Sequence, residues 1–270
     1  MSEKESPTRS HEHVLEIQAT PEVVWKAITD PAEIARWFAM SAETRPGKGG
    51  EIVYRWGELT GRCPILEWKP PAHLRTGWLE APATPAGEGP TLVVDWFLEG
   101  HGAKTTLRLV HSGFGHDARW DKEYDGTKRG WTFELQGLKH YLERQRGKSR
   151  RATWARQVTE LSPAAVWERF ARPGRLFREV ALDALGPGDR YRFVRVDGAV
   201  LEGRVLVNKA PLEFAGTLDG HGEGMLRFGF EDCLGAPEAH VWIATWDLGE
   251  HEFAALEASW KDLLARTFRA

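Results

Sequence analysis

Aromatic side chains recur at alternate positions of several strand-like segments in the first half of the sequence, as in Tyr54 and Trp56. Because successive side chains of a strand point to opposite faces, alternate positions share one face of a sheet. A face covered by large flat rings suits a pocket for a lipid-like or aromatic molecule, since such rings bury much apolar area. The candidate pocket residues are Trp37, Phe38, Tyr54, Trp56, Trp78, Trp96, His111 and Trp131. The alternative is that these rings only fill the interior and that no ligand binds.

His111 is the candidate whose side chain could do more than pack. It shares the strand face of Leu107 and Leu109 and lies at the end of that strand, near the mouth of the expected pocket. A histidine there could donate a hydrogen bond to a ligand or transfer a proton near neutral pH. We favour a simpler interpretation, in which the imidazole is hydrogen-bonded to a neighbouring backbone carbonyl.

Charged residues lie on the same strand-like segments and could act as acids or bases only if they pointed inward. We expect most of them to alternate outward as solvated side chains; they are Arg55, Arg62, Glu67, Arg75, Asp95 and Arg108. His11 and His13 share one strand face and could hold a metal with a third ligand, but no ligand cluster accompanies them. The sequence therefore predicts no catalytic residue, no metal site and no cofactor.

A long amphipathic helix over residues 129–146 follows these segments and must position them. Its apolar residues recur at helical spacing on one face, and charged residues occupy most other positions. The apolar positions are Trp131, Leu135, Leu138 and Leu142. A weaker copy over residues 250–269 closes the chain, with Phe253, Leu256, Trp260 and Leu263 on one face. We therefore expect an α+β fold, in which each of two curved antiparallel sheets wraps around its own long C-terminal helix.

The two halves of the sequence share features in the same order, which indicates an internal duplication. The segment 20–25, TPEVVW, matches the segment 162–167, SPAAVW, in cap residue, proline and tryptophan, 142 residues later. Gly203-Arg204 follows Gly61-Arg62 at the same distance. We place the domains at residues 11–147 and 152–270, with a short basic linker between them.

The composition is that of a globular protein with room for two domains. The chain has 270 residues, of which 41% are hydrophobic and 28% are charged, and its net charge is −3. This balance gives no general attraction to nucleic acid. The start of the sequence is polar, and no apolar run reaches the roughly 18 residues of a membrane span. We expect a cytoplasmic protein with no membrane insertion, whose two cysteines, Cys63 and Cys233, do not pair.

The order of strand, two short helices, antiparallel strands and long C-terminal helix resembles the START-like (SRPBCC) superfamily with the helix-grip fold. Residues 11–147 look most like its activator-of-heat-shock-chaperone-ATPase homologue branch. The resemblance rests on Ala19-Thr20-Pro21 with Val24-Trp25, Asp30-Pro31 with Arg36-Trp37-Phe38, the segment 106–114 (TLRLVHSGF), and Gly130-Trp131 with Leu138 and Tyr141-Leu142. The second domain is similar mainly as a diverged repeat, in which Thr245-Trp246 takes the place of His111-Ser112.

The resemblance implies three functions that the sequence leaves open. The first is non-enzymatic binding of a small hydrophobic molecule, lipid-like or aromatic, in a helix-grip cavity. The second is an enzyme similar to the tandem-domain polyketide aromatase/cyclases, which predicts that His111 converges with Arg55 or Asp95 in one pocket. The third is a chaperone-accessory protein that binds a chaperone through an exterior face.

Overall fold

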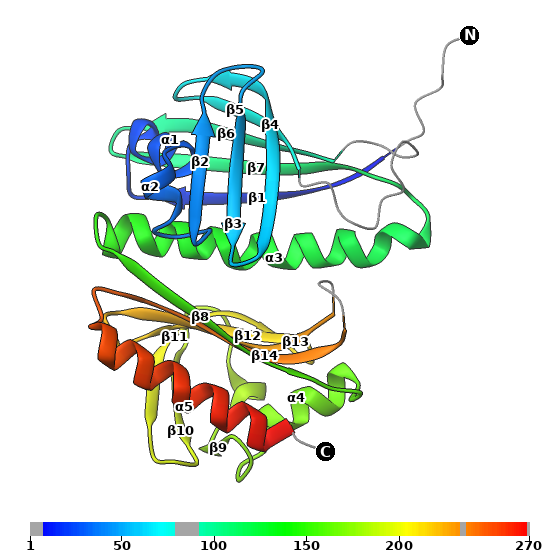
Figure 1. Ribbon diagram of the computed structural model, residues 1–270, viewed down its shortest axis with the longest axis vertical. Helices are drawn as coiled ribbons and strands as arrows, with labels where there is room; N and C mark the ends of the chain where they lie inside the picture. Colours follow the sequence, from blue (N-terminus) through cyan, green and yellow to red (C-terminus); the bar gives the residue numbers. More distant parts are fainter. Residues whose placement is uncertain (1–7, 79–91, 233–235, 269–270) are drawn as a thin grey trace. The chain divides into compact units, whose positions relative to one another are not determined.

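The computed structural model describes residues 8–78, 92–232 and 236–268 of the chain (Figure 1). The chain divides into two compact units, Met1–Gly147 and Lys148–Ala270. Each unit contains one seven-stranded antiparallel sheet and ends in a long helix. The predicted fold class, α+β with two tandem helix-grip domains, is confirmed. Within the described residues, no helix is long and apolar enough to cross a membrane.

The first sheet has the strand order β1-β7-β6-β5-β4-β3-β2, so that the first strand pairs with the last. Its strands are β1 (Arg9–Ile17), β2 (Ser41–Arg45), β3 (Glu51–Trp56), β4 (Leu59–Lys69), β5 (His73–Gly77), β6 (Val93–His101) and β7 (Lys104–Phe114). Two short helices, α1 (Pro21–Thr29) and α2 (Pro31–Ile34), follow β1. The unit closes with the 3-10 turn η1 (Ala118–Trp120), the helix α3 (Asp121–His140) and the π-helical turn η2 (Tyr141–Gln145).

The long helix begins earlier than the sequence pattern predicts. α3 starts at Asp121, although the apolar stripe led us to place the start at Arg129. Its first turns carry Asp121 and Glu123, which favour a helix N-terminus through the helix dipole. They also include Gly126, a poor helix former, and present little apolar surface. The stripe therefore marks only the apolar part of the helix; the first turns contact the sheet through the polar side chains of Tyr124 and Thr127.

A β-bulge changes the inward face of β4. The pairing of β4 with β5 shifts register between Ile65 and Glu67, which inserts an extra residue and reverses the alternation. Ile65 is buried, whereas Leu66 is 39% exposed. Simple alternation from Trp68 would place Leu66 in the interior, but the bulge turns its side chain to the outer face. Trp68, beyond the bulge, packs edge-on against Trp25 of α1 at a ring-centroid distance of 5.0 Å.

The second sheet repeats the strand order of the first as β8-β14-β13-β12-β11-β10-β9. Its strands are β8 (Arg150–Val158), β9 (Phe177–Glu179), β10 (Arg190–Arg195), β11 (Val200–Lys209), β12 (Glu213–Leu218), β13 (Gly224–Glu231) and β14 (Glu238–Trp246). The helices are α4 (Pro163–Ala171), the 3-10 turn η3 (Leu182–Ala184) and α5 (Glu250–Phe268). The last residue of the predicted helix, Arg269, lies outside the described residues.

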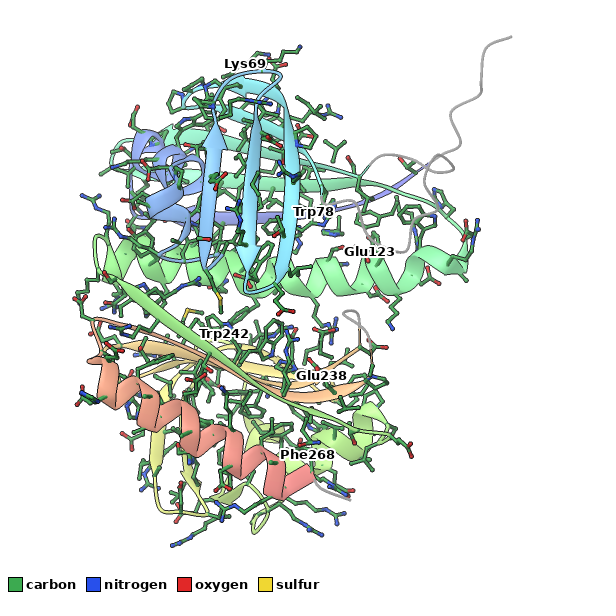
Figure 2. The ribbon with its side chains drawn as sticks, viewed as in Figure 1. Lys69, Trp78, Glu123, Glu238, Trp242 and Phe268 are labelled. Carbon is green, nitrogen blue, oxygen red and sulfur yellow. The ribbon has the colours of Figure 1, made fainter. Side chains whose placement is uncertain are left out.

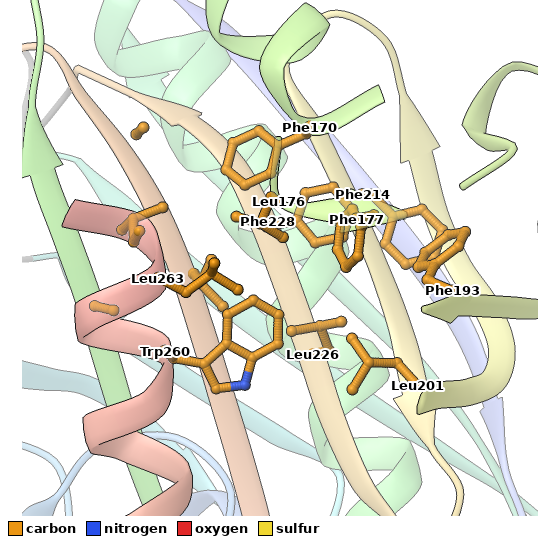
Figure 3. Close-up of a cluster of buried hydrophobic side chains, with 14 of the residues drawn as sticks. Phe170, Leu176, Phe177, Phe193, Leu201, Phe214, Leu226, Phe228, Trp260 and Leu263 are labelled. Atoms are coloured by element: carbon orange, nitrogen blue, oxygen red, sulfur yellow. The ribbon is translucent and has the colours of Figure 1, made fainter. Parts of the chain in front are cut away.

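The interior of the second domain is a dense cluster of phenylalanine and leucine side chains (Figure 3). Phe228 of β13 stacks on Phe170 of α4 at 4.8 Å and on Phe214 of β12 at 5.0 Å. Trp260 of α5 closes the cluster and is fully buried. These side chains fill the space between sheet and helix with hydrocarbon, as expected of a structural core.

Candidate functional site

Trp131 is the centre of the aromatic side chains in the first domain. It lies on α3, is 4% exposed, and faces the inner side of the sheet. Its ring stacks on Phe38 at 5.8 Å and contacts Trp78 at 5.0 Å and Trp96 at 5.3 Å. The helix, the segment after α2, the residue that follows β5 and strand β6 thus bring their rings to one place.

The remaining candidates extend this cluster through Phe38. That ring contacts Trp37 at 5.1 Å, Tyr54 at 5.1 Å and Trp56 at 5.2 Å. The structure therefore joins all the candidate residues in one set of ring contacts, which we call the Trp131 network. It consists of Trp37, Phe38, Tyr54, Trp56, Trp78, Trp96, His111 and Trp131.

The Trp131 network runs from the surface to the interior. Phe38, Trp56 and Trp78 are partly exposed, whereas the other members are buried. Trp78, labelled in Figure 2, directly follows β5. A molecule in contact with the exposed rings would therefore meet a continuous path of aromatic surface that leads to Trp131.

Hydrogen bonds hold the segment after α2 against the rest of the domain. The Asp30 carboxylate caps α2 by accepting from the backbone N–H groups of Ala32 and Glu33. The Tyr141 hydroxyl, at the end of the long helix, donates to the Glu33 carboxylate. The Trp37 indole donates to the carbonyl of Ala27 at 2.9 Å. Phe38 is thereby presented to Trp131 by a short, fixed connection.

His111 is the polar group at the buried end of the network. Its Nδ1 accepts a hydrogen bond from the Trp131 indole N–H at 3.1 Å, and its Nε2 has no hydrogen-bond partner in the part of the chain that the structure describes. Burial, together with His11 and His13, lowers the pKa of His111 to about 2, so the ring is neutral at physiological pH. One expectation is corrected here: the hydrogen-bond partner of His111 is an indole and not a backbone carbonyl.

His11 lies beside His111 on the neighbouring strand, where the β1–β7 register pairs the two residues. The Thr127 hydroxyl donates to the carbonyl of Glu123, so it accepts from His11 Nε2 at 3.1 Å. His11 Nδ1 is then the acceptor for His13 Nε2 at 3.2 Å. Burial, His13 and Lys128 lower the pKa of His11 to about 3, and burial followed by Lys128 lowers that of His13.

His13, His11 and Thr127 thus form a hydrogen-bonded chain at this end of the sheet, and the His11 ring contacts His111 at 5.3 Å. Within the described ranges, no three His, Cys, Asp or Glu side chains are grouped to hold a metal ion. Sequence reasoning did not include His11 or Phe114 in the site, although Phe114 contacts the His111 ring at 4.7 Å. The alternation of His11 and His13 was the available signal for one of them.

The charged strand residues lie on the outer face of the sheet, as expected from alternation. Val94, not Asp95, is the cross-strand partner of His111, and Asp95 is hydrogen-bonded to His73 at 2.7 Å. Arg55 forms an ion pair with Glu43 at 3.0 Å. The predicted convergence of His111 with Arg55 or Asp95 is therefore wrong, because the two sets of side chains are on opposite faces.

The second domain has no counterpart of the histidine pair. The residue 142 positions after His11 is Thr153, and β8–β14 pairing places Ile243 beside it. Ile243, and not Thr245, therefore occupies the place of His111, which corrects our alignment of the two halves. Ile243 is fully buried in the apolar cluster.

Residues 18–143 match the family model described as Activator of Hsp90 ATPase homolog 1-like protein. Protein MLL2253 from Mesorhizobium loti is 27% identical, over 51% of this chain and 99% of its own, with a TM-score of 0.45. The Aha1 dimer from Colwellia psychrerythraea is 20% identical, over 52% and 99%, with a TM-score of 0.44. The di-domain ARO/CYC BexL from the BE-7585A biosynthetic pathway is 17% identical, over 97% and 99%, with a TM-score of 0.43.

Comparison with curated proteins found no match. The helix-grip topology is present in both units, and the family match covers most of the first. The first of these two tandem START-like domains thus resembles the Activator of Hsp90 ATPase homolog 1-like family.

Proposed function

We propose that the first domain, residues 11–147, binds a small, flat, apolar molecule at the Trp131 network and does not catalyse a reaction. The observation that carries this proposal is the continuity of the network, from the partly exposed Phe38, Trp56 and Trp78 to the buried Trp131. Flat rings offer large contact area with few rotatable bonds, so they bind planar ligands at low entropic cost.

The chemistry of the inner face supports binding over catalysis. The titratable groups of the network and its neighbourhood include His11, His13 and His111, whose pKa values are lowered, and Tyr54, whose pKa burial raises, so all four are neutral at physiological pH. A general acid or base works best with a pKa near the operating pH. The strand carboxylates and guanidinium groups point away from this face.

Titration of the full chain with fluorene, a planar neutral hydrocarbon, tests the proposal. We expect quenching of tryptophan fluorescence, a rise in melting temperature, and a Kd that Trp131→Phe raises about 10-fold, since one central ring contact is reduced. Trp25→Phe is the matched control, because Trp25 is a buried tryptophan of the same domain whose ring contacts Trp68 outside the network.

The outcome that overturns the proposal is the absence of saturable binding by folded protein. Such a result would mean that the rings only fill the interior. Equal loss of affinity in Trp131→Phe and Trp25→Phe would place the binding site outside the Trp131 network.

A second candidate function is binding to a chaperone of the Hsp90 class, which the family match to residues 18–143 favours. Addition of the full chain to such a chaperone would then raise its rate of ATP hydrolysis, and the two proteins would co-purify. Unchanged ATP hydrolysis without co-purification would eliminate this function and leave the ligand proposal standing. The aromatase/cyclase alternative depended on convergent polar residues that the sheet separates, so we do not carry it forward.

A further inference from the structure

The protonation of His111 follows from its one hydrogen bond. The Trp131 indole nitrogen can only donate, so His111 Nδ1 at 3.1 Å must accept. In a neutral imidazole the other nitrogen then carries the proton. His111 Nε2 is therefore an N–H donor, and it is buried without an acceptor among the residues that the structure describes.

The neighbours of His111 explain why this donor is free. Rings surround it: His11 at 5.3 Å, Trp78 at 5.3 Å and Phe114 at 4.7 Å, each at a steep angle. Both nitrogens of His11 are engaged, with Thr127 and His13. An N–H directed at a ring face makes only a weak interaction, so the donor lacks a strong acceptor. Burying an unpaired donor is unfavourable, and native structures rarely keep one without a reason.

Water fits this position poorly. A buried water is held by two to four polar partners, whereas the ring cage around His111 offers one free donor. A carbonyl oxygen needs only that one donor, and the rest of a planar ketone would lie against the rings. An anion is also disfavoured, because the contacts of His111 within the described ranges are with neutral rings and an unpaired buried charge is costly.

We infer that the ligand of the Trp131 network is a neutral aromatic ketone, whose carbonyl oxygen accepts a hydrogen bond from His111 Nε2–H. This inference rests on the proposed binding function and adds the class of ligand. Trp131 has two parts in it: its ring packs against the ligand, and its indole N–H fixes the tautomer of His111 that can donate.

Two planar molecules that differ only at one carbon test the inference, fluorenone with a C=O group and fluorene with CH2. We expect the full chain to bind fluorenone about 10-fold more tightly than fluorene, as for one buried hydrogen bond. Fluorene-9-carboxylate, which adds a charge, should bind more weakly than either. The infrared stretching band of the fluorenone carbonyl should move to lower wavenumber on binding, as a hydrogen-bonded carbonyl does.

His111→Phe should abolish the preference, with both affinities within about twofold, because the donor is gone and the ring shape remains. His111→Gln keeps an N–H donor and should retain part of the preference. His13→Phe is the matched control, since His13 does not contact the Trp131 network and its change should leave the preference intact. The infrared band of the unaltered protein provides a readout that does not depend on whether His111→Phe folds.

The two proposals fail in different ways. Binding of neither fluorene nor fluorenone overturns the proposed function itself. Equal binding of both with an unshifted carbonyl band leaves the function standing and overturns the ketone inference. Tightest binding by the carboxylate overturns the neutral character of the ligand.

Discussion

The interiors of the two domains differ although their sheets have the same strand order. In the first domain tryptophans and His111 lie between sheet and helix, and His111 Nε2 has no partner among the described residues. In the second domain the corresponding side chains are mostly phenylalanine, leucine and isoleucine, and Ile243 replaces His111. One topology thus holds both a mainly hydrocarbon core and an interior built from tryptophans and a histidine.

This difference indicates which features the fold itself needs. The second domain shows that the helix-grip sheet is compatible with isoleucine at the position of His111, so His111 is not required by the topology. The unpaired Trp260 indole N–H of the second domain lies under the Arg195 guanidinium, whereas the His111 N–H of the first domain lies among aromatic rings at the inner end of a path from the surface, which suggests a role in recognition. The interior of the second domain, by contrast, has the apolar side chains expected of a repeat whose role is structural.

The largest expected change in stability comes from creating a cavity in the apolar core of the second domain. Phe228→Ala removes a ring stacked between Phe170 and Phe214, and it should lower the free energy of unfolding by about 3–5 kcal/mol, since the site cannot collapse fully. Urea denaturation of the full chain measures this, and hydrogen exchange shows which domain opens. Fluorene affinity should be unchanged. A loss of fluorene binding by folded Phe228→Ala would mean that the second interior also binds ligand.

Acid should destabilise the first domain through its buried His11 and His111. Unfolded histidines titrate near 6.5, whereas in the folded domain burial first, then neighbouring charges, lowers the pKa of His111 to about 2 and of His11 to about 3. The unfolded state therefore takes up the protons. The free energy of unfolding is at its full value above about pH 6.5 and falls as the pH drops toward 2–3, by up to about 1.4 kcal/mol per pH unit for each histidine.

Urea unfolding at several pH values, with hydrogen exchange to assign the domain, measures this dependence. The corresponding residues of the second domain, Thr153 and Ile243, do not titrate in this range. His111→Ile should reduce the pH dependence of the free energy of unfolding by the amount expected for one proton fewer taken up on unfolding. A flat profile between pH 6.5 and 4.5 would contradict the buried, neutral state of His11 and His111.

A smaller change in the free energy of unfolding is expected when His111 is replaced by isoleucine, the residue at the equivalent position of the second domain. His111→Ile removes one unpaired donor, His111 Nε2–H, but leaves another, the Trp131 indole N–H, without its acceptor. The two terms oppose each other, so the free energy of unfolding should change by less than about 1 kcal/mol. A loss above about 3 kcal/mol would show that His111 makes a second strong hydrogen bond and would remove the basis of the ketone inference.

Features of the fold and site that depend on short-range periodicity could be predicted from the sequence. Period-two alternation selected Tyr54, Trp56 and Trp96, and helical spacing selected Trp131, so rings from distant segments were correctly assigned to one interior. The resemblance added Trp37 and Phe38. The ring contacts join these residues, although they do not test whether a ligand binds.

Features that depend on register and tertiary pairing could not be predicted. The β-bulge beside Leu66 leaves no clear trace in composition, and it inverts one strand position. The start of α3 at Asp121 has acidic residues in its first turn but no side-chain cap and no apolar stripe, so the sequence pattern does not mark it. The hydrogen bond between Trp131 and His111 joins a helix to a strand end, so it follows from packing and not from local pattern.

The smallest effect should come from the outer face of the first sheet. Arg108 lies over the Phe97 ring at 4.1 Å and forms an ion pair with Glu12 at 3.3 Å, with both charges half-exposed. Exposed pairs contribute little, so Arg108→Ala should lower the free energy of unfolding by less than about 1 kcal/mol. Fluorene and fluorenone should bind as before. If Arg108→Ala weakened the binding of either molecule, the outer face of the sheet would take part in binding. The aromatic interior would then no longer be the feature that distinguishes the two domains.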